Sequence, residues 1–71
     1  MYIINIYEKI NCNIYYIGCL EYKKDSPLPR KDDFINIMIN EKPSLYRINA
    51  VLFDYIDNNE LISFLVDKAK E

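Results

Sequence analysis

The chain has 71 residues, of which 51% are hydrophobic and 28% charged, with a formal net charge of −2, a single glycine and no histidine. A chain of this length is expected to form a single domain over residues 1–71, which buries only about 60% of the surface that its unfolded form exposes. Without histidine there is no Ser-His-Asp or Cys-His arrangement, and with one glycine no phosphate-cradling loop, so we expect no enzyme activity, no metal and no cofactor.

An N-terminal β-hairpin is predicted first. Residues 2–8 and 14–23 are rich in β-branched and aromatic side chains, which fit a pleated surface, and residues 9–13 form the turn between them. Gly18 in the second strand indicates a bulge or a close crossing of another chain segment. A hairpin covered on one side would leave an apolar patch on the other, formed by Ile3, Tyr7, Tyr15 and Ile17. Either the sheet curls into a barrel that partly buries this patch, or the patch is an interface.

Residues 24–33 are predicted to be a surface loop. Pro27 and Pro29 lack the N–H group that a strand ladder needs. The loop region contains a basic cluster, a candidate contact for nucleic acid or an anionic ligand, formed by Lys23, Lys24, Arg30 and Lys31. Because Asp25, Asp32 and Asp33 lie among these residues, solvated loop charges are the favoured interpretation.

Residues 34–41 and 60–71 fit either a strand or a helix. In the first segment Ile35, Ile37 and Ile39 alternate strictly with other residues, which favours a strand, although Asp32 or Asp33 could cap a helix there. The second segment is more evenly balanced, with a slight preference for a strand over residues 61–68.

Residues 45–56 form the longest stretch with strand character, between turn signals at 42–44 and 57–59. Both faces of this strand are largely apolar, which predicts a position in the middle of the sheet. Phe53 is expected in the core or an interface, and Arg47 at the rim. The carboxylates of Asp54, Asp57 and Glu60 are expected to form a solvated acidic turn.

The predicted fold class is all-β: a five-stranded antiparallel meander that closes into a small SH3-like or OB-like barrel. If both ambiguous segments were helices, the alternative would be an α+β fold of ββαβα order. Cys12 and Cys19 are expected to be reduced and unbridged, with Cys19 covered by its strand. No stretch approaches the roughly 18 apolar residues of a membrane span and no signal peptide is evident, so we expect a cytoplasmic protein without membrane contact.

Surplus apolar surface on so small a chain predicts a homo-oligomer or a larger protein partner. The abundance of Ile, Asn, Lys and Tyr is typical of A/T-rich coding in low-GC bacteria and their phages. The leading hypothesis is therefore a small non-enzymatic binding or inhibitor protein, encoded by a phage or mobile element, that acts on a host defence protein. The candidate partner-binding residues are Ile3, Tyr7, Tyr15, Ile17, Arg47 and Tyr55.

Two other functions remain open. A nucleic-acid-binding barrel would stack bases on tyrosines beside the basic cluster, using Tyr15, Tyr22, Tyr46 or Tyr55. The net negative charge disfavours the hypothesis of nucleic-acid binding, because such binding depends on neutralising phosphates. An oligomeric binder or sponge for a small ligand such as a nucleotide would instead place its site between subunits.

Overall fold

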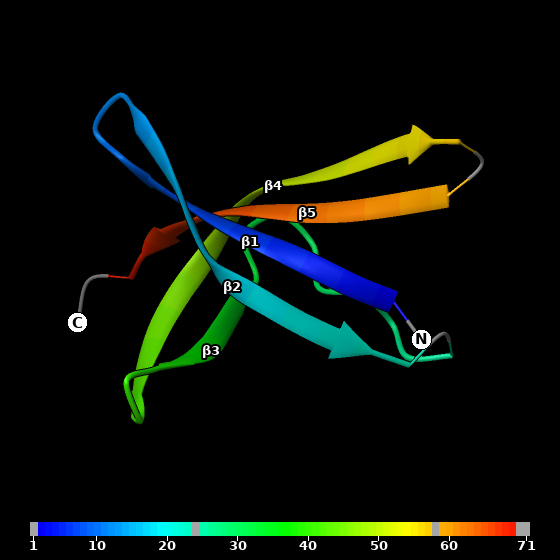
Figure 1. Ribbon diagram of the computed structural model, residues 1–71. Helices are drawn as coiled ribbons and strands as arrows, with labels where there is room; N and C mark the ends of the chain where they lie inside the picture. The colour runs from blue at the N-terminus through cyan, green and yellow to red at the C-terminus, as the bar shows by residue number, and fades with distance from the viewer. Residues whose placement is uncertain (1, 24, 58, 70–71) are drawn as a thin grey trace.

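The computed structural model describes residues 2–23, 25–57 and 59–69. Its five strands form one curled sheet, a half-barrel (Figure 1). The strands are β1 (Tyr2–Ile10), β2 (Asn13–Tyr22), β3 (Phe34–Ile39), β4 (Lys42–Ile56) and β5 (Asn59–Lys68). The predicted all-β class with five strands is confirmed, and both ambiguous segments are strands, so the ββαβα alternative is wrong. Over the described residues, no helix is long and apolar enough to cross a membrane.

The strand order is β2-β1-β5-β4-β3. In a closed five-stranded meander each strand would pair with the next one and β5 with β1. Here all of these pairings are present except the one between β2 and β3. The β1–β2, β3–β4 and β4–β5 pairs are antiparallel. The β1–β5 pair is parallel and runs from Ile4 opposite Ile62 to Glu8 opposite Val66. When an odd number of alternating strands curls round, its first and last members necessarily run in the same direction. The predicted small barrel-like sheet of five strands is therefore a half-barrel, in which one of the four strand pairs is parallel.

The seam between β2 and β3 stays open because of the segment that connects them. Pro27 and Pro29 bring no N–H groups to the seam, and Leu28 between them packs against the core. A hollow of about 390 Å³ remains there, lined by parts of β2 and β3 and by Pro29. The predicted irregular loop thus occupies the place where a closed barrel would have a fourth antiparallel pairing.

The turn between β3 and β4 lies at Asn40 and Glu41, earlier than the sequence indicates. Both residues have positive φ, 52° and 66°, as a two-residue type I′ hairpin turn requires. Pro43, which the sequence places in the turn, is a strand residue opposite Met38. A proline is tolerated there because β5 begins to pair with β4 only at Tyr46, so this part of β4 has one neighbouring strand.

The core lies on one face of the sheet, which we call the inner face. Among the side chains that the structure describes, nine buried hydrophobic ones come from four strands: Ile4, Ile6, Ile35, Ile37, Tyr46, Ile48, Ile62, Phe64 and Val66. Three of them belong to β5, which has β1 on one side and β4 on the other. The central strand of the sheet is therefore β5 rather than β4, and full burial of each of its side chains contributes about 1.5–3 kcal/mol.

Two bulges interrupt the sheet. In the β1–β2 pair, Ile6 is opposite Gly18 and Tyr7 is opposite Tyr16, so Ile17 is an extra residue. The bulge predicted at Gly18 is confirmed, whereas the close crossing is not: a side chain added at Gly18 would meet no atom within 4 Å. The second bulge lies in the β4–β5 pair, where Asn49 is the extra residue between Ile48 and Ala50.

Gly18→Ala is expected to destabilise the fold although space is open around it. Gly18 has φ +151°, a backbone conformation that side-chain-bearing residues rarely adopt. We expect a loss of about 1–3 kcal/mol in the free energy of unfolding by urea. Cys19→Ala, at the exposed neighbouring position, is the control and should change stability by less than about 0.5 kcal/mol. Equal stability of the two variants would contradict the strained-backbone assignment.

Phe53 is not in the core. Its side chain is 53% exposed, so the expectation that this chain buries it in a core is wrong, while burial in an interface stays a prediction. Phe53 pairs with Ile62 and lies on the inner side of β4. However, β3 pairs with β4 only as far as Arg47, so no residue of β3 lies beside Phe53 on the inner face.

One polar contact reaches the edge of the core. The hydroxyl of Tyr46, whose side chain is 3% exposed, donates a hydrogen bond of 3.5 Å to Oε1 of Glu8. Burial, and to a lesser extent the Glu8 carboxylate, raises the pKa of Tyr46 above its ordinary value of 10.0. The folded chain therefore holds this proton more tightly than the unfolded chain does.

Stability should consequently fall as the pH rises above about 10, because the unfolded chain then loses the Tyr46 proton while the folded chain retains it. Tyr46→Phe should be less sensitive to this alkaline range than the wild type. Urea unfolding below and above pH 10 measures the difference, with Tyr55→Phe as the same chemical change at an exposed ring. An alkaline loss of equal size in wild type and Tyr46→Phe would contradict this assignment.

Candidate protein-binding surface

The outer face of the sheet, opposite the core, carries a hollow of about 320 Å³. It lies where the β1–β2 hairpin and the β4–β5 hairpin diverge (Figure 1). Four strands line it, mainly with apolar side chains: Tyr7, Ile14, Leu52, Asp54, Ser63 and Leu65. We call this site the outer hollow. Its walls belong to paired strands.

The two bulges determine which side chains reach the outer hollow. On β2, Leu20 packs against the core, whereas Tyr16, beyond the bulge, lies opposite Tyr7 on the outer face. On β4, Ile48 is buried, whereas Leu52, beyond the second bulge, lies opposite Ser63. In an unbulged strand, residues separated by two or four positions would share a face. Each bulge thus transfers the even-numbered apolar residues of its strand from the inner to the outer face.

Two tyrosines stand at one side of the outer hollow. The rings of Tyr7 and Tyr16 meet edge to face, with centroids 5.5 Å apart and planes at 64°. Such a pair contributes about 0.5–1.5 kcal/mol beyond its buried area. Desolvation, then the neighbouring Cys19, raises the pKa of Tyr16 above its ordinary value. Tyr7 lines the hollow, and Tyr16 packs against it from the neighbouring strand.

The predicted partner-binding residues do not form one patch. Tyr15 lies opposite Glu8, on the other face from Tyr7, and Ile17 packs against the core at the bulge. The expected patch of Ile3, Tyr7, Tyr15 and Ile17 is therefore corrected: only Ile3 and Tyr7 share the outer face. Tyr55 is exposed near the end of β4. The residues that stand beside Tyr7 in their place are Ile14, Tyr16, Leu52 and Leu65.

Gly18 is a sequence signal for part of this arrangement of residues on the outer face. Once a bulge is placed there, every residue of the strand on its far side changes face, which exchanges Tyr15 for Tyr16. Asn49 gives no comparable signal, because asparagine is common in strands and turns alike. Leu52 could not have been assigned to the outer face from the alternation of β4 alone.

Arg47 lies at the rim, as expected, with its side chain 47% exposed. Its guanidinium Nη2 is 3.6 Å from Oδ2 of Asp67 on the neighbouring strand. An ion pair at this exposure contributes at most about 1 kcal/mol. A hollow of about 440 Å³ beside it is lined by Phe34, Arg47, Asp67, Lys68 and Ala69. The hollow beside Arg47 lies apart from the outer hollow and shares no lining residue with it.

The basic cluster is dispersed among carboxylates. Lys23, Arg30 and Lys31 are exposed, and Lys24 lies outside the described residues. The backbone N–H of Arg30 donates to Oδ2 of Asp33 at 2.8 Å, which holds an acidic group within the basic segment. Two of the tyrosines considered as stacking platforms are also occupied: Tyr46 is buried and Tyr22 packs against the core.

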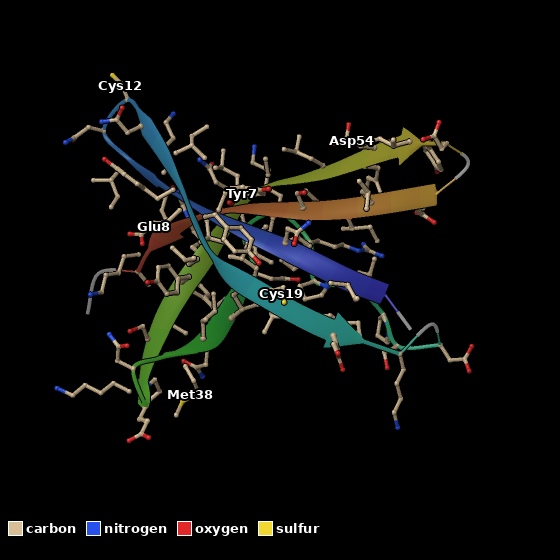
Figure 2. The ribbon with its side chains drawn as sticks, in the orientation of Figure 1. Tyr7, Glu8, Cys12, Cys19, Met38 and Asp54 are labelled. Carbon is tan, nitrogen blue, oxygen red and sulfur yellow. The ribbon has the colours of Figure 1, made fainter. Side chains whose placement is uncertain are left out.

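The acidic turn and the two cysteines also carry reactive side chains. Asp54 projects from the β4–β5 hairpin (Figure 2), and Asp57 and Glu60 are exposed nearby, but no cluster of three or more metal-ligating side chains occurs among the described residues. Cys12 and Cys19 are unbridged, and both are exposed. The expected covering of Cys19 is therefore wrong, because its strand position opposite Asn5 is on the uncovered outer face.

The outer hollow offers apolar contact and one carboxylate, Asp54, and can therefore hold an apolar group next to a positive charge. No Lys or Arg occurs from Ile48 to Val66, so the charged residues in this part of the β4–β5 hairpin are all acidic. Comparisons with protein-family models, with curated proteins and with solved structures give no match to this chain.

Proposed function

We propose that this chain is a small non-enzymatic protein-binding module that holds an apolar side chain of a larger protein in its outer hollow. The observation that carries the proposal is the hollow itself, an apolar site of about 320 Å³ between two diverging hairpins. Exposed apolar groups that gather in a concave site are typical of binding surfaces, whereas scattered ones are not.

Charge supports a particular kind of partner surface. Asp54 lines the outer hollow, and Asp57 and Glu60 lie at the adjoining turn. A complementary surface therefore presents an apolar side chain flanked by Lys or Arg. Charges at such a rim mainly raise the association rate and select the partner, while the apolar contact supplies affinity.

The composition supports a proposal about biological role. A small, acidic, A/T-rich chain fits an inhibitor encoded by a phage or mobile element, whose target is a larger host defence protein in the cytoplasm. Inhibition by occupying a basic surface requires neither catalysis nor a cofactor. The interleaved charges of residues 23–33 give less support to the nucleic-acid-binding alternative.

The test compares two exposed apolar residues of the outer face. Ile14→Asp places a carboxylate in the outer hollow, and Met38→Asp makes the same kind of change on β3, outside it. A partner purified from the natural host cells should bind the wild type and Met38→Asp equally. Ile14→Asp should bind about tenfold more weakly or worse, at unchanged thermal stability, because an unpaired charge would be buried.

Three results would contradict the proposed function. Equal binding by Ile14→Asp and wild type would show that the outer hollow is not the binding site. A co-purified single-stranded nucleic acid whose affinity falls steeply with salt would favour the nucleic-acid-binding alternative. A small molecule retained in native mass spectrometry of the purified chain would favour the ligand sponge.

A further inference from the structure

Strand β4 extends well beyond its neighbour β3. The two strands pair from Lys42 to Arg47, and the loop backbone continues the pairing through two hydrogen bonds. In these bonds, the N–H of Asp32 donates to Ile48 at 2.8 Å and the N–H of Ile48 donates to Asp33 at 2.9 Å. From Asn49 to Ile56, the described part of the chain places β5 on one side of β4 and no strand on the other.

This free edge spans eight residues, about 27 Å of extended chain. Every second residue along it directs its backbone N–H and C=O groups outward, toward a position that another strand would fill. Figure 1 shows this part of β4 at the margin of the sheet. Such an edge is a template for the addition of a further strand.

The side chains of the free edge are apolar and exposed. Leu52 is 50%, Phe53 53%, Tyr55 73% and Ile56 56% exposed. The edge has no Lys and no Pro, which natural proteins place on edges to prevent pairing, and its only charge is Asp54. Its bulge lies at its beginning, at Asn49, and leaves residues 50–56 regular.

The other edges of the sheet are better protected. The bulge at Ile17 bends β2 in its middle, and β3 is only six residues long. The segment with Pro27 and Pro29 lies beside both of them. The free edge of β4 is thus the long, regular and apolar one.

We propose that a second copy of this chain pairs with the free edge of β4, antiparallel and about a two-fold axis at Leu52. In this register Leu52 lies opposite Leu52 of the second copy, and Phe53 lies opposite Val51. Aromatic and β-branched side chains in such cross-strand pairs contribute about 0.2–1 kcal/mol each. The two half-barrels become one continuous sheet.

The charge pattern selects a second copy as the occupant. In the proposed register, the carboxylate of Asp54 lies opposite the methyl group of Ala50, so no like charges face each other. A two-fold axis also makes every favourable pair occur twice, since each copy presents the same edge. The proposal uses the backbone edge of β4, and because the side chains of Leu52 and Asp54 also line the outer hollow, the second copy would lie beside that site.

Sedimentation velocity across the micromolar range tests the assembly. The wild type should form a dimer, and Phe53→Lys should raise its dissociation constant by about tenfold or more, because lysine on an edge blocks strand addition. Phe34→Lys, the same change at an exposed ring on β3, should dimerise as the wild type does. A wild type that stays monomeric, or a dimer that Phe34→Lys weakens more than Phe53→Lys, would overturn the proposal.

A cross-linking experiment tests the register. In a background with Cys12→Ser and Cys19→Ser, Leu52→Cys should give a covalent dimer on mild oxidation. Directly opposite strand residues have Cα atoms about 4.5–5.5 Å apart, within the range of a disulfide. Leu61→Cys, on β5, should stay uncrosslinked. Cross-linking of Leu61→Cys but not of Leu52→Cys would overturn the proposed axis.

Discussion

Replacing Phe64 with alanine is expected to unfold most of the protein. The Phe64 side chain is 0% exposed and lies between Ile6 of β1 and Val51 of β4, so it contacts the strands on both sides of β5. Emptying an aromatic core site costs about 3–5 kcal/mol. A domain of this size has a total stability near the lower end of about 5–15 kcal/mol, so the loss removes most of it. Urea unfolding followed by circular dichroism measures the effect.

The matched control is Phe53→Ala. Phe53 lies on the same side of the sheet but is exposed, so its truncation should change the free energy of unfolding by only about 0.5 kcal/mol. Both variants should be measured at low protein concentration, where association through β4 does not contribute. A greater loss at Phe53 than at Phe64 would invert the assignment of the core.

Ile62→Asp is expected to have a comparably large effect with a distinct pH dependence. Ile62 is buried between Ile4 and Phe53, and a carboxylate there would have no hydrogen-bond partner among the core side chains. The neutral acid is buried more easily than the anion, so folding would raise the pKa of the introduced group. The variant should be unfolded at pH 7 and recover part of its stability, relative to wild type, as the pH falls toward about 4.

Leu61→Asp provides the comparison one residue away. Leu61 lies on the outer face, where its side chain already reaches solvent, and a carboxylate can stay hydrated there. Asp54 lies opposite Leu61, so repulsion between the two carboxylates should weaken this variant somewhat as the pH rises. We nevertheless expect a folded protein at pH 7, with a much smaller pH dependence than that of Ile62→Asp. A similar pH dependence in both variants would mean that Ile62 is not in a dry core.

Alternation with a period of two carried most of the fold prediction. Ile35 and Ile37 are both buried in β3, as the strict alternation of that segment indicates. The strand preference of its β-branched residues outweighs the helix-capping preference of Asp32 and Asp33. The end of β4 coincides with the predicted boundary at Ile56. Local pattern sufficed wherever a strand has one covered face and an uninterrupted register.

The pairing of strands far apart in the sequence, and the face of the sheet that each residue occupies, were harder to predict. Nothing near Ile4 or Ile62 in the sequence indicates that these residues meet in a parallel pair, because they are far apart along the chain. The bulge at Asn49 changes the face of every later β4 residue, and the end of β3 exposes Phe53. Burial of a patterned residue depends on which strand covers it, and that is a property of the whole sheet.

The parallel pairing of β1 and β5 also determines how the molecule should respond to mechanical force. The start of β1 and the end of β5 lie at opposite ends of this pair of strands (Figure 1), and the two strands pair at five positions. A pull between these ends therefore shears all the paired positions together, whereas opening a hairpin such as β3–β4 separates one pair at a time. The half-barrel should resist stretching along this direction much better than its small core would indicate.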